Sequence, residues 1–280
     1  MSEAAIRVEQ LCVRYRGPLR GTAVTALDAV GIAAKKGEIV ALLGPNGSGK
    51  TTLLRVLAGV QDQHSGVATV LGLVPTHRDL ALRAGWQPDG APPLLHLRAR
   101  DLLLWLGTFR GMSTSSAMER GMHWLDRLGL GRVADLRVRA FSSGMQRRLA
   151  LCLAFMTDPE VLLLDEPTAT LDPEGSWLVL GILKEFAARG AAILLASHHL
   201  QEVEQVCDRA YVLDHGRVRV EGSLDSLLGT GDDAIVVRGL DPKGHAAVAT
   251  TVQEHGGEIV RVEKAREHLF ALFRRLDKQS

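Results

Sequence analysis

A glycine-rich run between residues 44 and 51 contains the residue types that bind phosphate. Its letters, GPNGSGKT, fit the pattern G-x-x-x-x-G-K-[ST], in which glycines turn backbone N–H groups toward anionic oxygens. Lys50 is expected to reach the β- and γ-phosphates of a nucleotide, and the Thr51 hydroxyl to ligate Mg²⁺. The predicted nucleoside triphosphate site consists of Gly44, Pro45, Asn46, Gly47, Ser48, Gly49, Lys50, Thr51 and Thr52.

Two adjacent carboxylates follow an apolar run further along the chain. Residues Val161–Leu164 are typical of a buried strand, and Asp165 and Glu166 come directly after it. We expect Asp165 to hold Mg²⁺ and Glu166 to polarise an attacking water as a general base. A lone acid after a strand can instead cap a helix. The phosphate-binding pattern upstream favours the catalytic interpretation.

Two histidines follow another apolar run, Ala191–Ala196, after an intervening serine. Ligands of doubly wound sheets bind at the carboxyl ends of the strands. His198 is therefore expected to contact the γ-phosphate and to hold Glu166 and the water in register. His199 is expected to face outward or to cap the following helix, and a pair of plain surface histidines is the alternative.

The elements around these residues alternate between strands and helices. The apolar run Ile39–Leu43 leads into the glycines, and Thr51–Gly59 has the pattern of a helix that ends at a glycine. Residues 6–15 and 24–34 alternate enough to predict two more strands. Alternation of this kind predicts an α/β fold with a parallel sheet covered on both faces.

The pattern changes character in two places. Residues 90–150 show helical periodicity with few β-branched runs, which predicts a helical subdomain inserted into a unit spanning 1–228. A Gly/Thr/Asp-rich stretch at 229–233 is typical of a linker. Residues 234–280 then predict strand, helix, strand and helix, a small α+β accessory domain with a regulatory or dimer-stabilising role.

Composition limits the kinds of partner and compartment. The 280 residues are 46% hydrophobic and 23% charged, and 33 basic against 32 acidic residues give a net charge of +1. With this balance the protein has no overall positive potential that would attract nucleic acid, so no nucleic-acid partner is expected. The apolar runs are too short to span a bilayer, and the first residues lack a signal-peptide pattern. Three scattered cysteines fit a reducing compartment, so we expect a cytoplasmic protein.

The ordered series of motifs over residues 5–225 resembles the ATP-binding subunit of ABC transporters. Phe141–Met145, FSSGM, stands where that family has its LSGGQ signature. The resemblance implies an ABC-type nucleotide-binding domain, a P-loop NTPase fold with a parallel core, an antiparallel β subdomain and a helical insertion. It also implies that Ser142 and Gly144 bind the γ-phosphate held by a second subunit. Ser143 and Met145 depart from the signature in a way that is similar to the export-type branch.

Three further site residues follow from the same resemblance. Tyr15 matches the aromatic residue that stacks on adenine, although a core tyrosine is the alternative. Asp172 matches the D-loop acid that helps to join the two subunits. The Q-loop departs from the family because Asp89 stands at the glutamine position, where it is expected to orient water on the metal. Gln87 would substitute only if the loop slipped by two residues.

The resemblance also predicts partners and a location. A second ATPase subunit, identical or different, is expected to complete the site around ATP and Mg²⁺. An integral membrane permease is expected to hold the pair at the inner face of the cell membrane. The contact surface is predicted to involve the part of the insertion that is not core, together with Trp86 and the loop after Asp89; the candidate residues of the insertion are Leu102, Leu103, Leu104, Trp105 and Phe109.

Three other functions share some of these motifs. The ATPase of an ABC importer would have the same catalytic residues, but it usually keeps both signature and Q-loop glutamines. A non-transport ABC ATPase acting on ribosomes or DNA would carry two cassettes or a long coiled coil. A simple P-loop kinase would leave Ser142, Gly144 and His198 without a role. The sequence therefore favours an ATPase subunit that drives export of an unspecified substrate.

Overall fold

The computed structural model describes residues 4–16, 23–62, 64–228 and 242–255. The chain divides into two compact units, Met1–Leu228 and Gly229–Ser280. In the second unit the described part is the helix α9 (Pro242–Glu254), where the sequence predicted a helix. The predicted linker, both predicted strands and the last predicted helix of that unit lie outside the described residues. In the described residues, no helix combines the length and apolarity needed to cross a bilayer.

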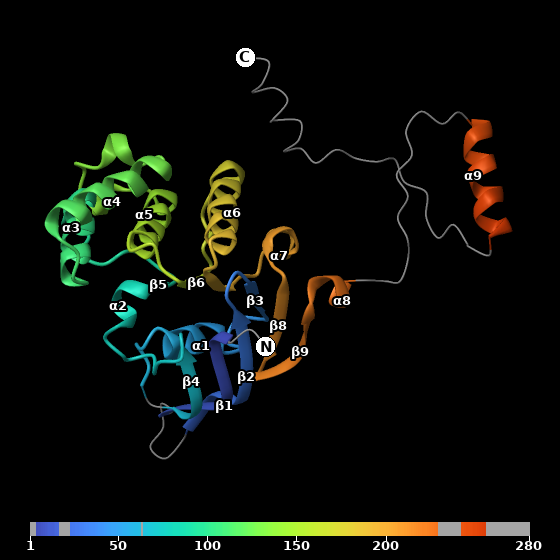
Figure 1. Cartoon of the computed structure of the whole chain (residues 1–280), viewed down its shortest axis with the longest axis horizontal. Coiled ribbons are helices and arrows are strands. Elements are labelled where there is room, and N and C mark those ends of the chain that lie inside the picture. Colours follow the sequence, from blue (N-terminus) through green and yellow to red (C-terminus); the bar gives the residue numbers. More distant parts are fainter. Residues whose placement is uncertain (1–3, 17–22, 63, 229–241, 256–280) are drawn as a thin grey trace. The chain divides into compact units, whose positions relative to one another are not determined.

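The first unit is built around a six-stranded sheet (Figure 1). The strand order is β5-β6-β7-β3-β8-β9, and every pair is parallel except the last. The strands β3 and β7 are fully apolar, and β6 is apolar up to its last residue, because both faces of these strands are covered. The bounds are β3 (Ile39–Leu43), β5 (Ala84–Gln87), β6 (Val161–Asp165), β7 (Ala192–Ala196), β8 (Arg209–Asp214) and β9 (Arg217–Ser223).

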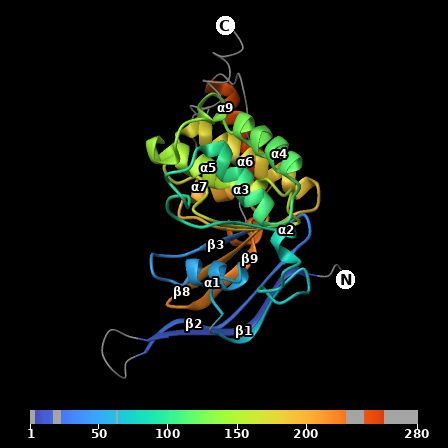
Figure 2. The same ribbon diagram turned by 90° about the vertical axis from the view of Figure 1, so that its left-hand side faces the viewer.

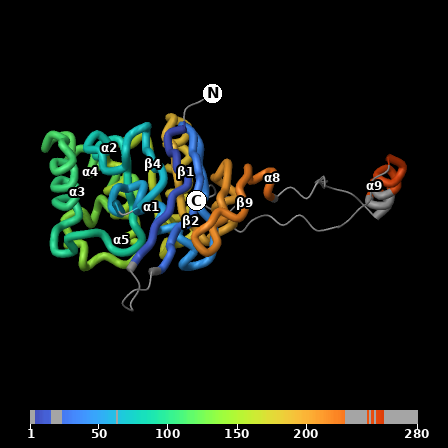
Figure 3. The backbone as a smooth tube through the Cα atoms, turned by 90° about the horizontal axis from the view of Figure 1, so that it is seen from below, coloured from blue at the N-terminus to red at the C-terminus, as the bar shows by residue number. Residues whose placement is uncertain are grey.

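A second sheet packs below one face of the first, as Figures 2 and 3 show. It is antiparallel, has the order β2-β1-β4, and consists of β1 (Ala4–Arg16), β2 (Ala23–Lys35) and β4 (Ser65–Val70). Helix α1 (Lys50–Leu57) lies in the shared core, where its buried leucines contact both sheets. This is the antiparallel subdomain that the family resemblance implied.

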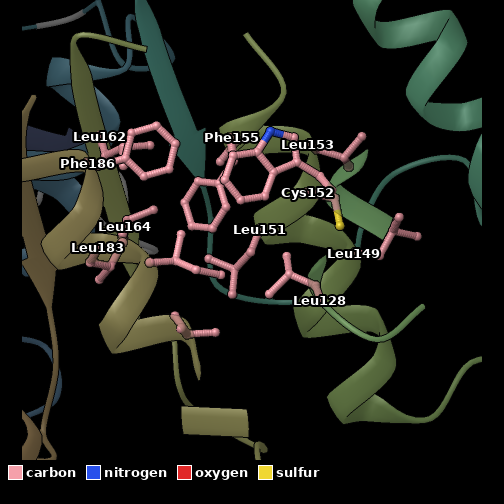
Figure 4. Packing of buried hydrophobic residues seen from close by; sticks show 14 of the residues in the cluster. Leu128, Leu149, Leu151, Cys152, Leu153, Phe155, Leu162, Leu164, Leu183 and Phe186 are labelled. Carbon is pink, nitrogen blue, oxygen red and sulfur yellow. The ribbon is translucent and has the colours of Figure 1, made fainter. Parts of the chain in front are cut away.

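Helices cover the opposite face of the six-stranded sheet. The sheet has a hydrophobic core on each face, and successive residues of a strand point into different cores. Leu162 and Leu164 lie in the core on the helical side, and Leu163 lies in the other core. Phe155 and Phe186 belong to the core on the helical side, together with Leu162 and Leu164 (Figure 4). The helices are α3 (Ala99–Phe109), α4 (Thr114–Arg127), α5 (Ser143–Phe155) and α6 (Pro173–Ala188), with the short α2 (Leu80–Arg83), α7 (Leu200–Val206) and α8 (Leu224–Leu228) elsewhere in the unit.

Two strands of this unit carry no clear signal in the sequence. β4 is short and mostly exposed on one side, and β5 has four residues including a glycine. Gly85 in β5 is required by packing, because a Cβ there would lie 2.3 Å from the carbonyl oxygen of Ala154 in α5. The helix α5 therefore approaches the edge strand as closely as the two backbones allow.

Replacing Gly85 with alanine is expected to destabilise the unit by about 1–3 kcal/mol, because the methyl group must push α5 away from β5. Urea unfolding followed by circular dichroism measures this change. Gly181→Ala in α6 is the matched control, since a Cβ there meets no atom within 4 Å. It should raise stability by roughly 0.5–1 kcal/mol. Equal midpoints for the two variants would contradict the close contact.

Candidate functional site

A pocket of about 200 Å³ lies at the carboxyl ends of β3 and β6. Residues from four parts of the sequence line it, and all but one of them were predicted as site residues. The lining residues are Ala26, Asn46, Gly47, Gly49, Lys50, Thr51, Thr52, Asp89, Asp165 and Glu166. The fold thus brings together the phosphate-binding loop, the two adjacent carboxylates and the Q-loop acid. Ala26, on β2, is the lining residue that the sequence did not indicate.

The phosphate-binding loop connects β3 to α1 and depends on glycine at two close contacts. Gly44 has φ 141°, and a Cβ there would lie 2.1 Å from the carbonyl oxygen of Leu213. Gly49 has φ 109°, and its Cβ would meet the Leu27 side chain at 2.6 Å. Both positions combine the left-handed region with a lack of space, so no other residue fits. The tight loop exposes Asn46 and Gly47 at the mouth of the pocket.

Lys50 is buried beneath this loop. Its Nζ atom donates to the carbonyl oxygens of Gly44 at 2.7 Å and Pro45 at 3.0 Å. The ammonium group is therefore held at the floor of the pocket, at the N-terminal end of α1. The N-cap Gly49 offers no side chain to the first N–H groups of the helix. Lysine, loop amides and helix N-terminus together form a site for anionic oxygens.

Thr51 and Asp165 face each other across the pocket. The Asp165 carboxylate is almost completely buried, and the Thr51 hydroxyl beside it favours its ionised form. Burial raises the pKa of Asp165, and the nearby charges of Asp89 and Glu166 raise it further. The Asp165 Oδ2 atom is buried and has no hydrogen-bond partner in the described part of the chain. A hydroxyl and an unsatisfied carboxylate oxygen fit Mg²⁺, a hard cation that prefers oxygen ligands.

Glu166 occupies a strained backbone position at the end of β6. Its φ is 52°, in the left-handed region that costs a non-glycine residue on the order of 1 kcal/mol or more. A hydrogen bond from its backbone N–H to the Ala196 carbonyl oxygen, at 2.9 Å, fixes this turn against β7. The Glu166 side chain reaches the pocket and forms a hydrogen bond with His198. The His198 Nδ1 atom lies 2.8 Å from Glu166 Oε2.

The two histidines after β7 differ in their contacts. His198 contacts Glu166, as the sequence predicted for an orienting residue. His199 is exposed and directly precedes α7, but its side chain makes no capping hydrogen bond. The two rings lie near each other, with centroids 4.1 Å apart.

The Q-loop candidates lie in different environments. Asp89 lines the pocket, whereas Gln87 is fully buried and donates from Nε2 to the Asp165 carbonyl oxygen at 3.0 Å. Gln87 therefore supports the end of β6 and does not line the nucleotide pocket. Arg147, which the sequence did not single out, also contacts this region: its Nη2 atom lies 2.7 Å from Asp89 Oδ1. A basic residue inside an amphipathic helix gives no local sign of such a contact.

The signature residues begin α5 and do not line the pocket. Ser142 caps this helix by accepting from the Met145 N–H at 3.3 Å. Ser143 is the first helical residue and has no positive φ, so its replacement of a glycine costs no left-handed strain. Gly144 sits close to the backbone, since a Cβ there would lie 3.1 Å from the Thr170 carbonyl oxygen.

Two further predicted residues also lie outside the pocket lining. Asp172 caps α6 by accepting from the Gly175 N–H at 2.9 Å. Tyr15 is half-buried in β1, beside Val24 of β2, and packs against the core between the two sheets. Both contacts lie within the chain. The exposed faces of the two side chains remain available for other contacts.

A phosphate-binding loop, a buried acid facing its threonine, and a glutamate paired with a histidine define a P-loop nucleoside triphosphatase. The sequence model described as ABC transporter matches residues 27–169. The chain belongs to this family as an ATP-binding, ATP-hydrolysing subunit. This result confirms the predicted fold class and the predicted reaction.

Curated relatives extend the match over most of the chain. Nod factor export ATP-binding protein I of Sinorhizobium fredii (strain NBRC 101917 / NGR234) is 38% identical over 248 residues, covering 87% of this chain and 71% of that protein. The uncharacterised ABC transporter ATP-binding protein YxlF of Bacillus subtilis (strain 168) is 34% identical over 222 residues, covering 79% and 72%.

Solved structures share the fold. One described as the ATP-binding subunit of an ABC transporter has a TM-score of 0.71 and 27% identity, covering 80% of this chain and 91% of that one. A dimeric ATP-binding cassette in a post-hydrolysis state, bound to ADP and Pi, has a TM-score of 0.71 and 23% identity, covering 78% and 98%.

Replacing Lys50 with glutamine is expected to weaken ATP binding at least tenfold, since charged hydrogen bonds are worth about 1.5–3 kcal/mol each. Titration with a fluorescent ATP analogue measures the affinity. Lys184→Gln is the control, because Lys184 is an exposed lysine on α6. Thermal unfolding of both variants separates lost binding from lost folding. Unchanged affinity in a folded Lys50→Gln chain would rule out Lys50 as a phosphate ligand.

Proposed function

We propose that two subunits of this kind enclose two MgATP molecules and use their hydrolysis to drive export through a separate membrane permease. One observation carries the proposal. Ser142 and Gly144 form a capped helix start, yet they lie outside the pocket that their own chain forms. A partner subunit that places its ATP against this helix would give the signature residues their ligand.

The chain's own pocket would hold most of each nucleotide. Lys50 and the loop N–H groups would bind the phosphates, and Tyr15 would contribute its exposed face to the base. Thr51, Asp165 and, through water, Asp89 would hold Mg²⁺, which would supply charge neutralisation at the phosphate oxygens. The unsatisfied Asp165 Oδ2 atom supports this assignment.

The hydrolytic step would use Glu166 as the general base. Its carboxylate lies in the pocket and would take a proton from the attacking water. His198 would fix the Glu166 carboxylate through the 2.8 Å contact and reach toward the γ-phosphate. The Ser142 hydroxyl and the N-terminus of α5 from the partner would bind the phosphoryl group as its charge develops. Asp172 would help to join the subunits. A single copy would therefore bind ATP but hydrolyse it slowly.

Similarity to Nod factor export ATP-binding proteins supports export as the direction of transport. The permease contact would lie on α3, where Trp105 and Phe109 stack with ring centroids 5.4 Å apart and Phe109 is 75% exposed. Leu102 and Leu103 on the same helix are buried and belong to the core. Trp86 packs with one part of its side chain against the core and would use the remaining part, with the loop after Asp89, to extend this contact. This docking would place the subunit at the inner face of the membrane.

Replacing Glu166 with glutamine is expected to stop hydrolysis while preserving ATP binding, and so to trap an ATP-bound dimer. Size-exclusion chromatography with saturating MgATP should show a dimer for Glu166→Gln. The double variant Lys50→Gln/Glu166→Gln should stay monomeric because it cannot hold the nucleotide. A Glu166→Gln chain that binds ATP and remains monomeric would contradict the shared site.

Replacing Phe109 with aspartate is expected to reduce co-purification with the permease from detergent-solubilised membranes at least tenfold, because a charge would have to enter an apolar contact. Because the Phe109 ring is exposed, its replacement should change folding and ATP affinity little. Leu178→Asp on α6 is a control at another exposed apolar residue. Equal co-purification of both variants would argue against α3 as the docking surface.

A further inference from the structure

Arg147 is a buried cation that links three elements of the ATPase unit. Its side chain is 6% exposed and belongs to α5, two helical turns before the contact with Gly85. The Nη2 atom lies 2.7 Å from Asp89 Oδ1, and the Nη1 atom donates to the Asp165 carbonyl oxygen at 3.3 Å. One guanidinium group therefore contacts the Q-loop acid and the end of β6 at once.

Backbone geometry explains why these atoms meet. The contact between Gly85 and Ala154 fixes α5 against β5 at one point. Arg147 lies seven residues before Ala154, a rise of about 10.5 Å along a helix. Asp89 lies two residues beyond the end of β5. The contact between Arg147 and Asp89 therefore joins α5 to the segment that follows β5, two helical turns before the contact at Ala154.

The ion pair fixes the carboxylate of Asp89. Its Oδ1 atom accepts from Arg147 and from the Gly90 N–H at 2.9 Å. The Arg147 side chain is 6% exposed and the Asp89 side chain 59% exposed, so the pair joins a buried cation to a carboxylate that solvent also reaches. The two hydrogen bonds hold the Asp89 Oδ1 atom next to α5 and to Gly90.

The same carboxylate belongs to the nucleotide pocket. Asp89 lines it together with Asp165 and Glu166, so three acids converge on one small volume. Arg147 offsets part of this negative charge from behind the pocket wall. The cation therefore affects both the position and the electrostatic environment of the groups around the nucleotide.

We propose that Arg147 is a positioning residue that couples the signature helix α5 to the nucleotide pocket of its own chain. Ser142 at the start of α5 lies five residues before Arg147, about 7.5 Å along the helix axis. A shift of α5, caused by the partner's ATP at Ser142, would move Asp89 and the end of β6 through the two guanidinium contacts. This inference rests on the proposed shared site.

A double-mutant cycle tests the coupling in the full chain. Arg147→Gln, Asp89→Gln and the double variant are compared by their kcat and KM for MgATP. Each single variant should lose about tenfold in kcat, because it leaves one charge unpaired, with less than about a threefold change in KM. The two losses should be non-additive: the double variant, which pairs two neutral amides, should keep a kcat well above the product of the two single effects.

Arg189→Gln is the control for loss of an arginine, because Arg189 pairs with Asp158 at 3.1 Å with both side chains largely exposed. It should leave kcat unchanged. Thermal unfolding of every variant shows whether a fall in kcat merely follows lost folding. Additive losses in kcat, or a loss of stability without a change in kcat, would overturn the coupling.

The parent chain and Glu166→Gln are measured in parallel. If the parent hydrolyses ATP and Glu166→Gln dimerises while the cycle is additive, the coupling alone is wrong. If Glu166→Gln binds ATP without dimerising, the shared site is wrong and the coupling is overturned with it.

Discussion

The parallel pairing of β6, β7 and β3 determines the geometry on which the rest of the unit depends. These neighbouring strands pair over Val161–Asp165, Ala192–Ala196 and Ile39–Leu43, and each is followed by polar residues at the same edge. Both faces of the strands are buried, so the apolar residues leave no alternative register without exposing a core. The phosphate loop, the acid pair and the histidine pair therefore meet although more than 100 residues separate the first two in the sequence.

The parts that could be predicted from the sequence are those with local causes. The glycines of residues 44–49, Lys50 and Thr51 have a spacing that only one loop geometry explains, and the structure places Gly47, Gly49, Lys50 and Thr51 around one pocket. Asp165 was predictable because an apolar strand that ends in an acid has few other uses once a phosphate loop is present.

The parts that could not be predicted depend on packing between distant segments. β5 has too few residues to show periodicity, and its position follows from pairing with β6. Arg147 has the sequence context of an ordinary helical surface residue, yet the close approach at Gly85 buries it beside Asp89. The motif favoured Asp89 over Gln87 for the Q-loop position, but the surroundings of the two side chains depend on packing: Gln87 turns toward the end of β6 and Asp89 toward the pocket.

The left-handed backbone at Glu166 has a consequence for how this chain can change over evolutionary time. Few side chains tolerate a positive φ, and β-branched residues tolerate it least. The backbone conformation therefore limits which residues can replace Glu166, whatever their chemical function. Aspartate, asparagine and glycine enter at low conformational cost, whereas valine, isoleucine and threonine do not. Lineages that abandon hydrolysis while keeping the fold would accordingly pass through a narrow set of codons at residue 166.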